Sequence, residues 1–317
     1  MRERLFWILK DYGIDERIAK AFLEVPREEF LMKHYSLSHV YEDVVLVSYE
    51  DGEVFSTSSQ PSLMAMFMEW VELGEGMKVL EIGGGTGYNA AVMSRIVGEN
   101  GFVVTVEYFE KVCKIARENV RRLGIDSVAV VCGDGYYGVP DFAPYDVIFV
   151  TVGVDEIPEH WFRQLKDEGR VIVPINMKFS GRQPAFLFVK KGNHLEGNYK
   201  LETRFIEAGG NLGNLLERNK KLLKEFPFRK TIRVPRLQMF VELVDLLTRR
   251  LTRMNGTFYY AGPEGTVEFS GGEMRIYGDT PEIESLLSQW KSCDYRSFEH
   301  LTLHVGYNAL SRISCTI

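Results

Sequence analysis

Between Lys78 and Pro174 the chain alternates short apolar runs with helical stretches, and this alternation constrains the fold more than any other feature. The runs are rich in valine and isoleucine, as expected of strands buried on both faces of a parallel sheet. Helices between them would supply the crossover connections that parallel strands need. We therefore predict an α/β fold with a doubly wound, mostly parallel, Rossmann-like sheet. The predicted strands are 78–82, 102–107, 128–132, 146–152 and 170–174, and the predicted helices are 88–97 and 109–123.

Two further regions flank this alternation. Residues 1–35 carry apolar positions at helical spacing and predict an N-terminal helical cap. The alternation stops after Asn211, and 317 residues exceed the most common domain size of about 100–150. We therefore expect a first domain over 1–212 and a smaller α+β accessory domain over 213–317. In the latter, helices are predicted over 215–225, 237–254 and after Pro281, and strands over 257–261, 267–269, 274–277 and near 301–305.

The composition is that of a folded, soluble protein, with 45% hydrophobic and 26% charged residues. The net charge of −6 gives no overall attraction to nucleic acid, and the longest basic cluster, Arg249 to Arg253, falls on a predicted helix. No stretch approaches the roughly 18 apolar residues of a membrane span. The apolar stretch near the N-terminus is also too short for a signal peptide. We expect a cytoplasmic protein that binds neither nucleic acid nor membranes.

The cysteines and histidines show no pattern that indicates a metal site. The four cysteines form no Cys-x-x-Cys pair and no regular framework, so we predict reduced thiols rather than zinc ligands or disulfides. His34 and His39 lie close in sequence, but no other histidine or cysteine nearby completes a ligand set. No bound metal is therefore predicted.

A glycine-rich loop follows the first predicted strand of the sheet and leads into a helix. Its spacing, Gly83-x-Gly85-x-Gly87, differs from the Gly-x-Gly-x-x-Gly that favours a dinucleotide. Such a loop lets a ligand approach the backbone, and the next helix offers unpaired N–H groups. Glu81, at the strand end, could receive the ammonium of a methionine moiety. An ordinary tight turn is the alternative for the loop alone.

Acidic residues also end the next two predicted strands. Glu107 lies twenty residues after Gly87, close to the spacing at which a carboxylate accepts both ribose hydroxyls. Asp134, in Gly133-Asp134-Gly135, could accept from an adenine amino group. A solvated glutamate and an Asp-Gly turn are the respective alternatives. Together these positions favour S-adenosylmethionine, with S-adenosylhomocysteine as product. The expected cofactor-binding residues are Ser59, Glu81, Gly83, Gly85, Gly87, Glu107, Asp134 and Gly135.

Several longer motifs recur in one known family. They are Val25-Pro-Arg-Glu-Glu-Phe30, Thr57-Ser-Ser-Gln-Pro61, Val79-Leu-Glu-Ile-Gly-Gly-Gly-Thr-Gly-Tyr88, Gly133-Asp-Gly135 and Gly169-Arg-Val-Ile-Val-Pro174. In order and spacing, the stretch from Ala21 to Gly210 resembles the protein-L-isoaspartate O-methyltransferases. The resemblance implies methyl transfer to the α-carboxylate of isoaspartyl residues in damaged proteins and peptides. The ester then closes to a succinimide, whose hydrolysis restores some aspartate.

The resemblance places the family's active-site serine on Ser59, with Thr57 beside it, and we take both as the candidate catalytic residues. A carboxylate acceptor with a pKa near 3.5 is already ionised at neutral pH, so no general base is expected. Ser59 would position the acceptor or the cofactor. The alternative is capping of the helix that begins at Pro61. The chain departs from the family at Val54-Phe55-Ser56 and at Ser58, which puts the pocket lining in doubt.

Two rival functions remain open from the sequence. A methyltransferase acting on nucleic acid is disfavoured, because Val150-Thr-Val-Gly153 stands where amino-directed enzymes carry Asn/Asp-Pro-Pro-aromatic, and the chain has no Pro-Cys nucleophile. A small-molecule carboxyl methyltransferase differs only in its acceptor. A protein that binds the cofactor without catalysis would not need the Thr57 and Ser59 element. The sequence gives no oligomeric state.

Overall fold

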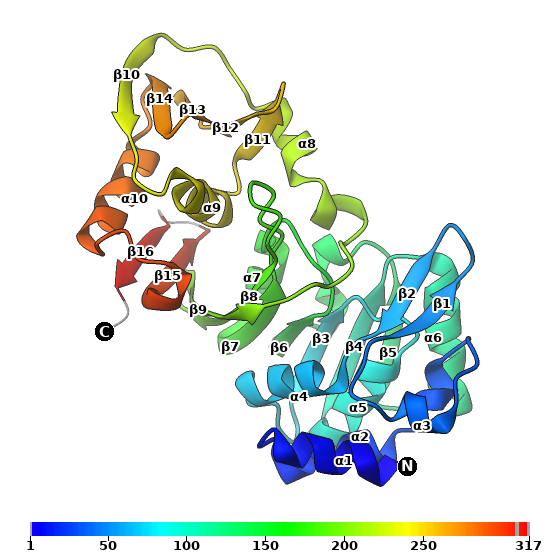
Figure 1. The fold of residues 1–317 in the computed structure, drawn as a ribbon. Coiled ribbons are helices and arrows are strands. Elements are labelled where there is room, and N and C mark those ends of the chain that lie inside the picture. The colour runs from blue at the N-terminus through cyan, green and yellow to red at the C-terminus, as the bar shows by residue number, and fades with distance from the viewer. Residues whose placement is uncertain (1, 308–310, 316–317) are drawn as a thin grey trace. The chain divides into compact units, whose positions relative to one another are not determined.

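The computed structural model describes residues 2–307 and 311–315, which form two compact units. The first runs to Val152 and includes Arg163–Ile172. The second comprises Gly153–Phe162 and the chain from Val173 onward. Figure 1 labels the elements of both. No helix among the described residues is long and apolar enough to cross a membrane.

The first unit contains a parallel sheet in the order β7-β6-β3-β4-β5, which confirms the predicted doubly wound α/β fold. The chain builds outward from β3 to β5, then returns to the other side of β3 with β6 and β7. The carboxyl ends of β3 and β6 therefore mark the point where the strand order reverses, and ligands bind at such points in open α/β sheets. The strands are β3 (Lys78–Ile82), β4 (Phe102–Glu107), β5 (Val128–Cys132), β6 (Tyr145–Val150) and β7 (Leu165–Pro174).

Helices cover this sheet and extend into the N-terminal cap. Both α5 (Tyr88–Val97) and α6 (Glu110–Arg122) pack on β4 and β5, while α2 (Glu16–Glu24) packs on α4 (Pro61–Trp70) and α5. The predicted helical cap is confirmed by α1 (Arg2–Asp11), α2 and the short η1 (Arg27–Phe30). The remaining elements of this unit are α3 (Leu37–Val40), the antiparallel pair β1 (Leu46–Glu50) and β2 (Phe55–Ser58), η2 (Gly135–Tyr137) and η3 (Pro140–Phe142). Helix α7 (Glu159–Gln164) begins in the second unit and ends in the first.

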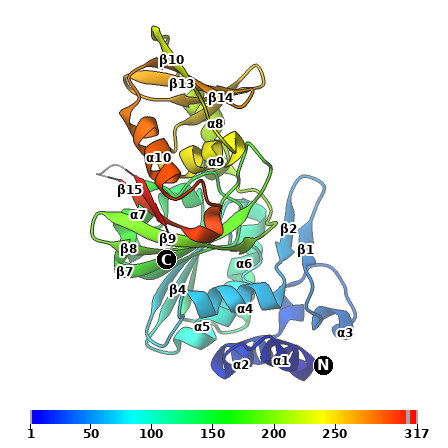
Figure 2. The same ribbon diagram turned by 60° about the vertical axis from the view of Figure 1, so that its left-hand side comes forward.

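The second unit is an α+β arrangement with two antiparallel groups of strands. One group has the order β16-β15-β9-β8 and the other β10-β14-β13-β12-β11. Helix α9 contacts strands of both groups, β15 and β11, and also α10 (Figure 2). The strands are β8 (Pro184–Lys191), β9 (His194–Glu202), β10 (Phe228–Arg233), β11 (Leu251–Met254), β12 (Thr257–Ala261), β13 (Gly265–Ser270), β14 (Glu273–Gly278), β15 (Leu301–Gly306) and β16 (Arg312–Cys315). The helices are η4 (Gly210–Gly213), α8 (Leu215–Lys220), α9 (Leu237–Thr248), α10 (Pro281–Ser292) and η5 (Phe298–His300).

The predicted helix over 237–254 is too long. Helix α9 ends at Thr248, and Arg249 adopts a left-handed conformation with φ of 55° before β11 begins. Leu251 continued the apolar spacing of the helix, so periodicity alone could not locate its end. The basic cluster therefore lies across a turn and a strand. The predicted helix over 215–225 likewise ends earlier, at Lys220.

The prediction of reduced thiols is also wrong. Cys113 of α6 is bonded to Cys132 at the end of β5, and Cys293 after α10 is bonded to Cys315 of β16. Each bond joins a helix, or the residue that follows it, to a strand that packs on that helix. Sequence spacing does not show these pairs because tertiary packing brings them together.

Candidate active site

The glycine loop between β3 and α5 has the backbone geometry that its sequence predicts. Gly83, Gly85 and Gly87 have φ values of 96°, 50° and 95°, where glycine is the favoured residue. A Cβ on Gly83 would lie 2.7 Å from Thr151 Oγ1, and one on Gly84 would lie 2.3 Å from Thr105 Oγ1. Thr105 and Thr151 therefore pack closely against the loop. Gly87 is the N-cap of α5.

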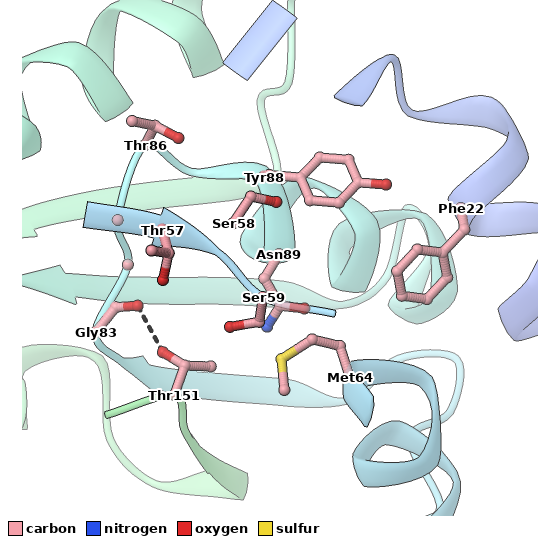
Figure 3. A pocket seen from close by; sticks show the side chains of 12 residues that line it. Phe22, Thr57, Ser58, Ser59, Met64, Gly83, Thr86, Tyr88, Asn89 and Thr151 are labelled. Carbon is pink, nitrogen blue, oxygen red and sulfur yellow. Dashed lines mark hydrogen bonds between the residues drawn. The ribbon is translucent and has the colours of Figure 1, made fainter. Parts of the chain in front are cut away.

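A pocket lies beside this loop and opens to solvent, and the space around its lining, open solvent included, is about 450 Å³. Figure 3 shows side chains approaching it from the end of β2 and the residue that follows, from the glycine loop, from α2 and from the starts of α4 and α5. The structure thus brings the predicted Thr57 and Ser59 together with the predicted Gly83 and Gly85. The lining residues are Phe22, Thr57, Ser58, Ser59, Met64, Gly83, Gly84, Gly85, Thr86, Tyr88, Asn89 and Thr151.

Glu81 lies beneath the pocket rather than on its wall. Its side chain is fully buried, and its two oxygens accept hydrogen bonds from Asn89 Nδ2 at 2.7 Å and Thr105 Oγ1 at 2.6 Å. Burial raises the pKa of the Glu81 carboxyl to about 7, partly offset by these hydrogen bonds. Asn89, which the sequence analysis missed, does line the pocket. Any contact between Glu81 and a ligand there would be relayed by this amide.

Glu107 ends β4 beside the glycine loop. Its Oε2 accepts from the Gly85 backbone N–H at 2.8 Å, and its Oε1 accepts from Phe109 N–H at 3.0 Å. Burial raises the pKa of the Glu107 carboxyl, although these backbone hydrogen bonds act against it. A carboxylate has about four acceptor sites, so Glu107 can also accept from ligand hydroxyls.

Asp134 follows β5 and caps η2, with Oδ1 accepting from Tyr136 N–H at 3.0 Å. The turn that the sequence offered as an alternative is therefore present. Gly135 is buried at the start of η2. Neither residue lines the pocket described above, so their contact with an adenine ring stays a prediction.

A buried arginine holds the segment that carries Thr57 and Ser59. The Arg27 side chain is fully buried, and its Nη2 donates to the carbonyl oxygens of Ser58 and Ser59 at 3.1 and 3.0 Å. Its Nε donates to Ser58 Oγ at 3.0 Å, which gives the unusual serine at that position a partner. Nη1 reaches the Val40 carbonyl at 3.1 Å. The guanidinium thus fixes the path of this segment towards the pocket.

The structure removes the capping role considered for Ser59. Helix α4 has Gln60 as its N-cap, and that side chain makes no capping hydrogen bond. Asp43 serves instead, because its Oδ1 accepts from Ser62 N–H and its Oδ2 from Gln60 Nε2, both at 2.8 Å. Ser59 lines the pocket without being needed to cap the helix.

The pocket offers polar groups that suit S-adenosylmethionine. Asn89 Oδ1 and the Tyr88 hydroxyl are buried and lack hydrogen-bond partners among the described residues. Burial without a partner is costly, and a ligand ammonium or hydroxyl would remove that cost. The close-packed glycines leave backbone rather than side chains facing the ligand, and Glu107 lies next to them. The cofactor chosen from the sequence therefore fits the residues present.

Comparisons with known proteins agree over the whole chain. The family model "Protein-L-isoaspartate(D-aspartate) O-methyltransferase" matches residues 1–213, and "Protein-L-isoaspartyl O-methyltransferase, C-terminal domain" matches residues 214–317. A protein-L-isoaspartate O-methyltransferase of Thermotoga maritima is 74% identical over all 317 residues of both chains. One from Methanosarcina mazei is 42% identical over 175 residues, which cover 55% of this chain and 70% of that protein.

Solved structures give the same result. A structure described as a protein-L-isoaspartate O-methyltransferase, 74% identical in sequence, superposes over all of both chains with a TM-score of 0.98. A Plasmodium falciparum structure in complex with S-adenosyl-L-homocysteine is 22% identical, has a TM-score of 0.56, and matches 65% of this chain and 97% of its own. At that identity the second match supports the fold alone.

Proposed function

The chain belongs to the protein-L-isoaspartate O-methyltransferase family, and we propose that it methylates isoaspartyl residues of proteins at the pocket beside the glycine loop. It is an S-adenosylmethionine-dependent protein carboxyl O-methyltransferase. The observation that carries the assignment of the site is that Thr57 and Ser59 line the same pocket as Gly83 and Gly85.

Residues of the first unit would hold the cofactor, which supplies an electrophilic methyl carbon bonded to a sulfonium. Asn89 Oδ1 would accept a hydrogen bond from the methionine ammonium, and Glu81 holds the Asn89 amide in place through Nδ2. Glu107 would accept from the ribose hydroxyls while retaining its bond from Gly85 N–H. We assign Asp134 and Gly135 to the adenine. The support for these roles is the unpaired Asn89 oxygen and the position of Glu107 at the carboxyl end of β4, next to the glycine loop.

The acceptor needs positioning more than proton transfer. An α-carboxylate is ionised at neutral pH, so no residue of the pocket would need to remove a proton from the acceptor. The Ser59 hydroxyl donates to the other carboxylate oxygen and aligns the attack, with Thr57 beside it. Alignment of this kind, together with exclusion of water, supplies much of the rate enhancement in such displacements. Phe22 and Met64 give the pocket an apolar wall.

We also propose a catalytic domain over 1–212, an accessory domain over 213–317, a cytoplasmic location and no nucleic-acid or membrane partner. The meeting of the two family models after residue 213 supports the boundary. The net charge of −6 supports the absence of nucleic acid. Two disulfides are unusual in the cytosol of mesophiles but are found inside cells of hyperthermophiles, so they are compatible with that location only in the latter setting.

Ser59→Ala tests the role of the hydroxyl. With an isoaspartyl peptide and labelled S-adenosylmethionine, we expect kcat/KM to fall about 100-fold while the melting temperature stays unchanged. Ser56→Ala is the matched control, because Ser56 lies in the same segment and bonds to Ser48 at 3.1 Å without lining the pocket. Equal activity of the two variants would contradict the proposed role.

A further inference from the structure

Three potential metal ligands meet on one face of the antiparallel strands β9 and β15. His194 and Glu196 lie two residues apart on β9, so both side chains lie on the same face of the strand. His304 on β15 is the register partner of Glu196. One ligand atom from each lies within 4.8 Å of the others, and this is the one such group of three or more among the described residues. The three residues belong to the second unit.

The free nitrogens of both histidines are the ones available to an ion. His194 Nε2 and His304 Nδ1 are buried and have no hydrogen-bond partner among residues 2–307 and 311–315. The opposite nitrogens are occupied, because His194 Nδ1 lies 3.3 Å from Asn193 Oδ1 and His304 Nε2 lies 3.1 Å from Ser314 Oγ. When these outer nitrogens donate their protons, the inner nitrogens carry lone pairs. Metal-binding histidines are oriented by outer hydrogen bonds of this kind.

The separation between His304 Nδ1 and Glu196 Oε2 suits two ligands of one small cation better than a direct hydrogen bond. His304 Nδ1 lies 3.4 Å from Glu196 Oε2, too far for a good hydrogen bond. Zinc bonds of about 2.0–2.1 Å place neighbouring ligand atoms of a tetrahedral site about 3.4 Å apart. The His304 side chain is only 9% exposed, whereas that of Glu196 is 43% exposed. An ion would therefore enter the site from solvent past the Glu196 side chain.

We propose that His194, Glu196 and His304 bind a divalent transition-metal ion of the zinc class, with water as the fourth ligand. Two imidazoles and a carboxylate form a three-ligand set that zinc accepts. The neighbouring cations, Lys191 and Arg312, pair in register with His194 and His304, but both are exposed and screened by solvent. The ion ties β9 to β15. This site is independent of methyl transfer.

The test is titration of the full-length, metal-free protein with zinc chloride by calorimetry. We expect one equivalent to bind, and the melting temperature to rise with zinc concentration. Cobalt(II) at the same site is expected to give the intense visible absorption of tetrahedral coordination. Glu196→Gln and His304→Gln should each abolish stoichiometric binding, and Ser314→Ala should weaken it by roughly 10- to 100-fold.

His300→Gln is the matched control, because it removes an exposed histidine from the same unit and should leave binding intact. If burial makes His304→Gln fold poorly, the half-exposed Glu196→Gln decides the question. The proposal would be overturned if the unaltered protein bound no zinc stoichiometrically, or if Glu196→Gln still bound it. The three residues would then form a metal-free histidine–carboxylate group.

Discussion

Replacing Glu81 with glutamine tests the buried carboxyl beneath the cofactor pocket. Folding raises the pKa of Glu81 from 4.5 to about 7, mainly through burial. At about 1.4 kcal/mol per pKa unit, this shift corresponds to about 3 kcal/mol. A raised carboxyl pKa stabilises the fold below the unfolded-state pKa, and that stabilisation is lost as the pH rises from 4.5 to about 7. Glutamine does not titrate and loses nothing over this range.

The free energy of unfolding of both proteins, without cofactor, would be measured by urea denaturation from pH 4.5 to 7.5. As the pH rises over this range, we expect the unaltered protein to lose about 3 kcal/mol of unfolding free energy relative to Glu81→Gln. The variant's free energy of unfolding minus that of the unaltered protein should therefore increase by the same amount. Any hydrogen bond that the glutamine fails to make with Asn89 or Thr105 adds an offset that does not depend on pH. Glu53→Gln, at an exposed position, controls for the lost charge. A difference that stays constant with pH would show that folding does not raise the pKa of Glu81.

Three further perturbations test the architecture around the pocket. Gly84→Ala places a Cβ 2.3 Å from a buried threonine oxygen, so we expect a loss of about 1–3 kcal/mol in stability and weaker S-adenosylhomocysteine binding by calorimetry, whereas Gly74→Ala should be nearly neutral. Arg27→Lys removes the planar set of donors that holds the Ser59 segment, and thermal unfolding and methyl-transfer assays should both show a loss; unchanged activity would contradict the described role. Replacing Cys113 and Cys132 together by alanine should cost about 3 kcal/mol in urea denaturation, and free thiols at these positions in the unaltered protein would contradict the bond.

The sequence predicted the features that local patterns determine. Continuous apolar runs separated by helical stretches identified the parallel sheet, and the glycine spacing located a loop whose φ values require glycine. These apolar runs do not show which face of the sheet each side chain points to, because a strand buried on both faces has no alternation of apolar and polar residues. Glu81 was expected to receive a ligand ammonium directly or through water, and the sequence did not show that its carboxylate accepts hydrogen bonds from Asn89 and Thr105.

Features built from distant segments could not be predicted. The cap of α4 comes from Asp43, which left Ser59 free of the role that its position suggested. His194 and His304 lie on strands that pair only in the fold, so their distance in the sequence gives no sign that they meet. Asn89 gave a weak signal, as a polar residue in the first turn of the helix after the loop.

The identity of the methyl acceptor can be decided by a paired peptide assay. The purified full-length protein would be given labelled S-adenosylmethionine and either an isoaspartyl peptide or its aspartyl twin, identical except for the peptide linkage. We predict that label enters the isoaspartyl peptide as a base-labile methyl ester and does not enter the twin. Equal labelling of both peptides, or of neither, would contradict the assignment.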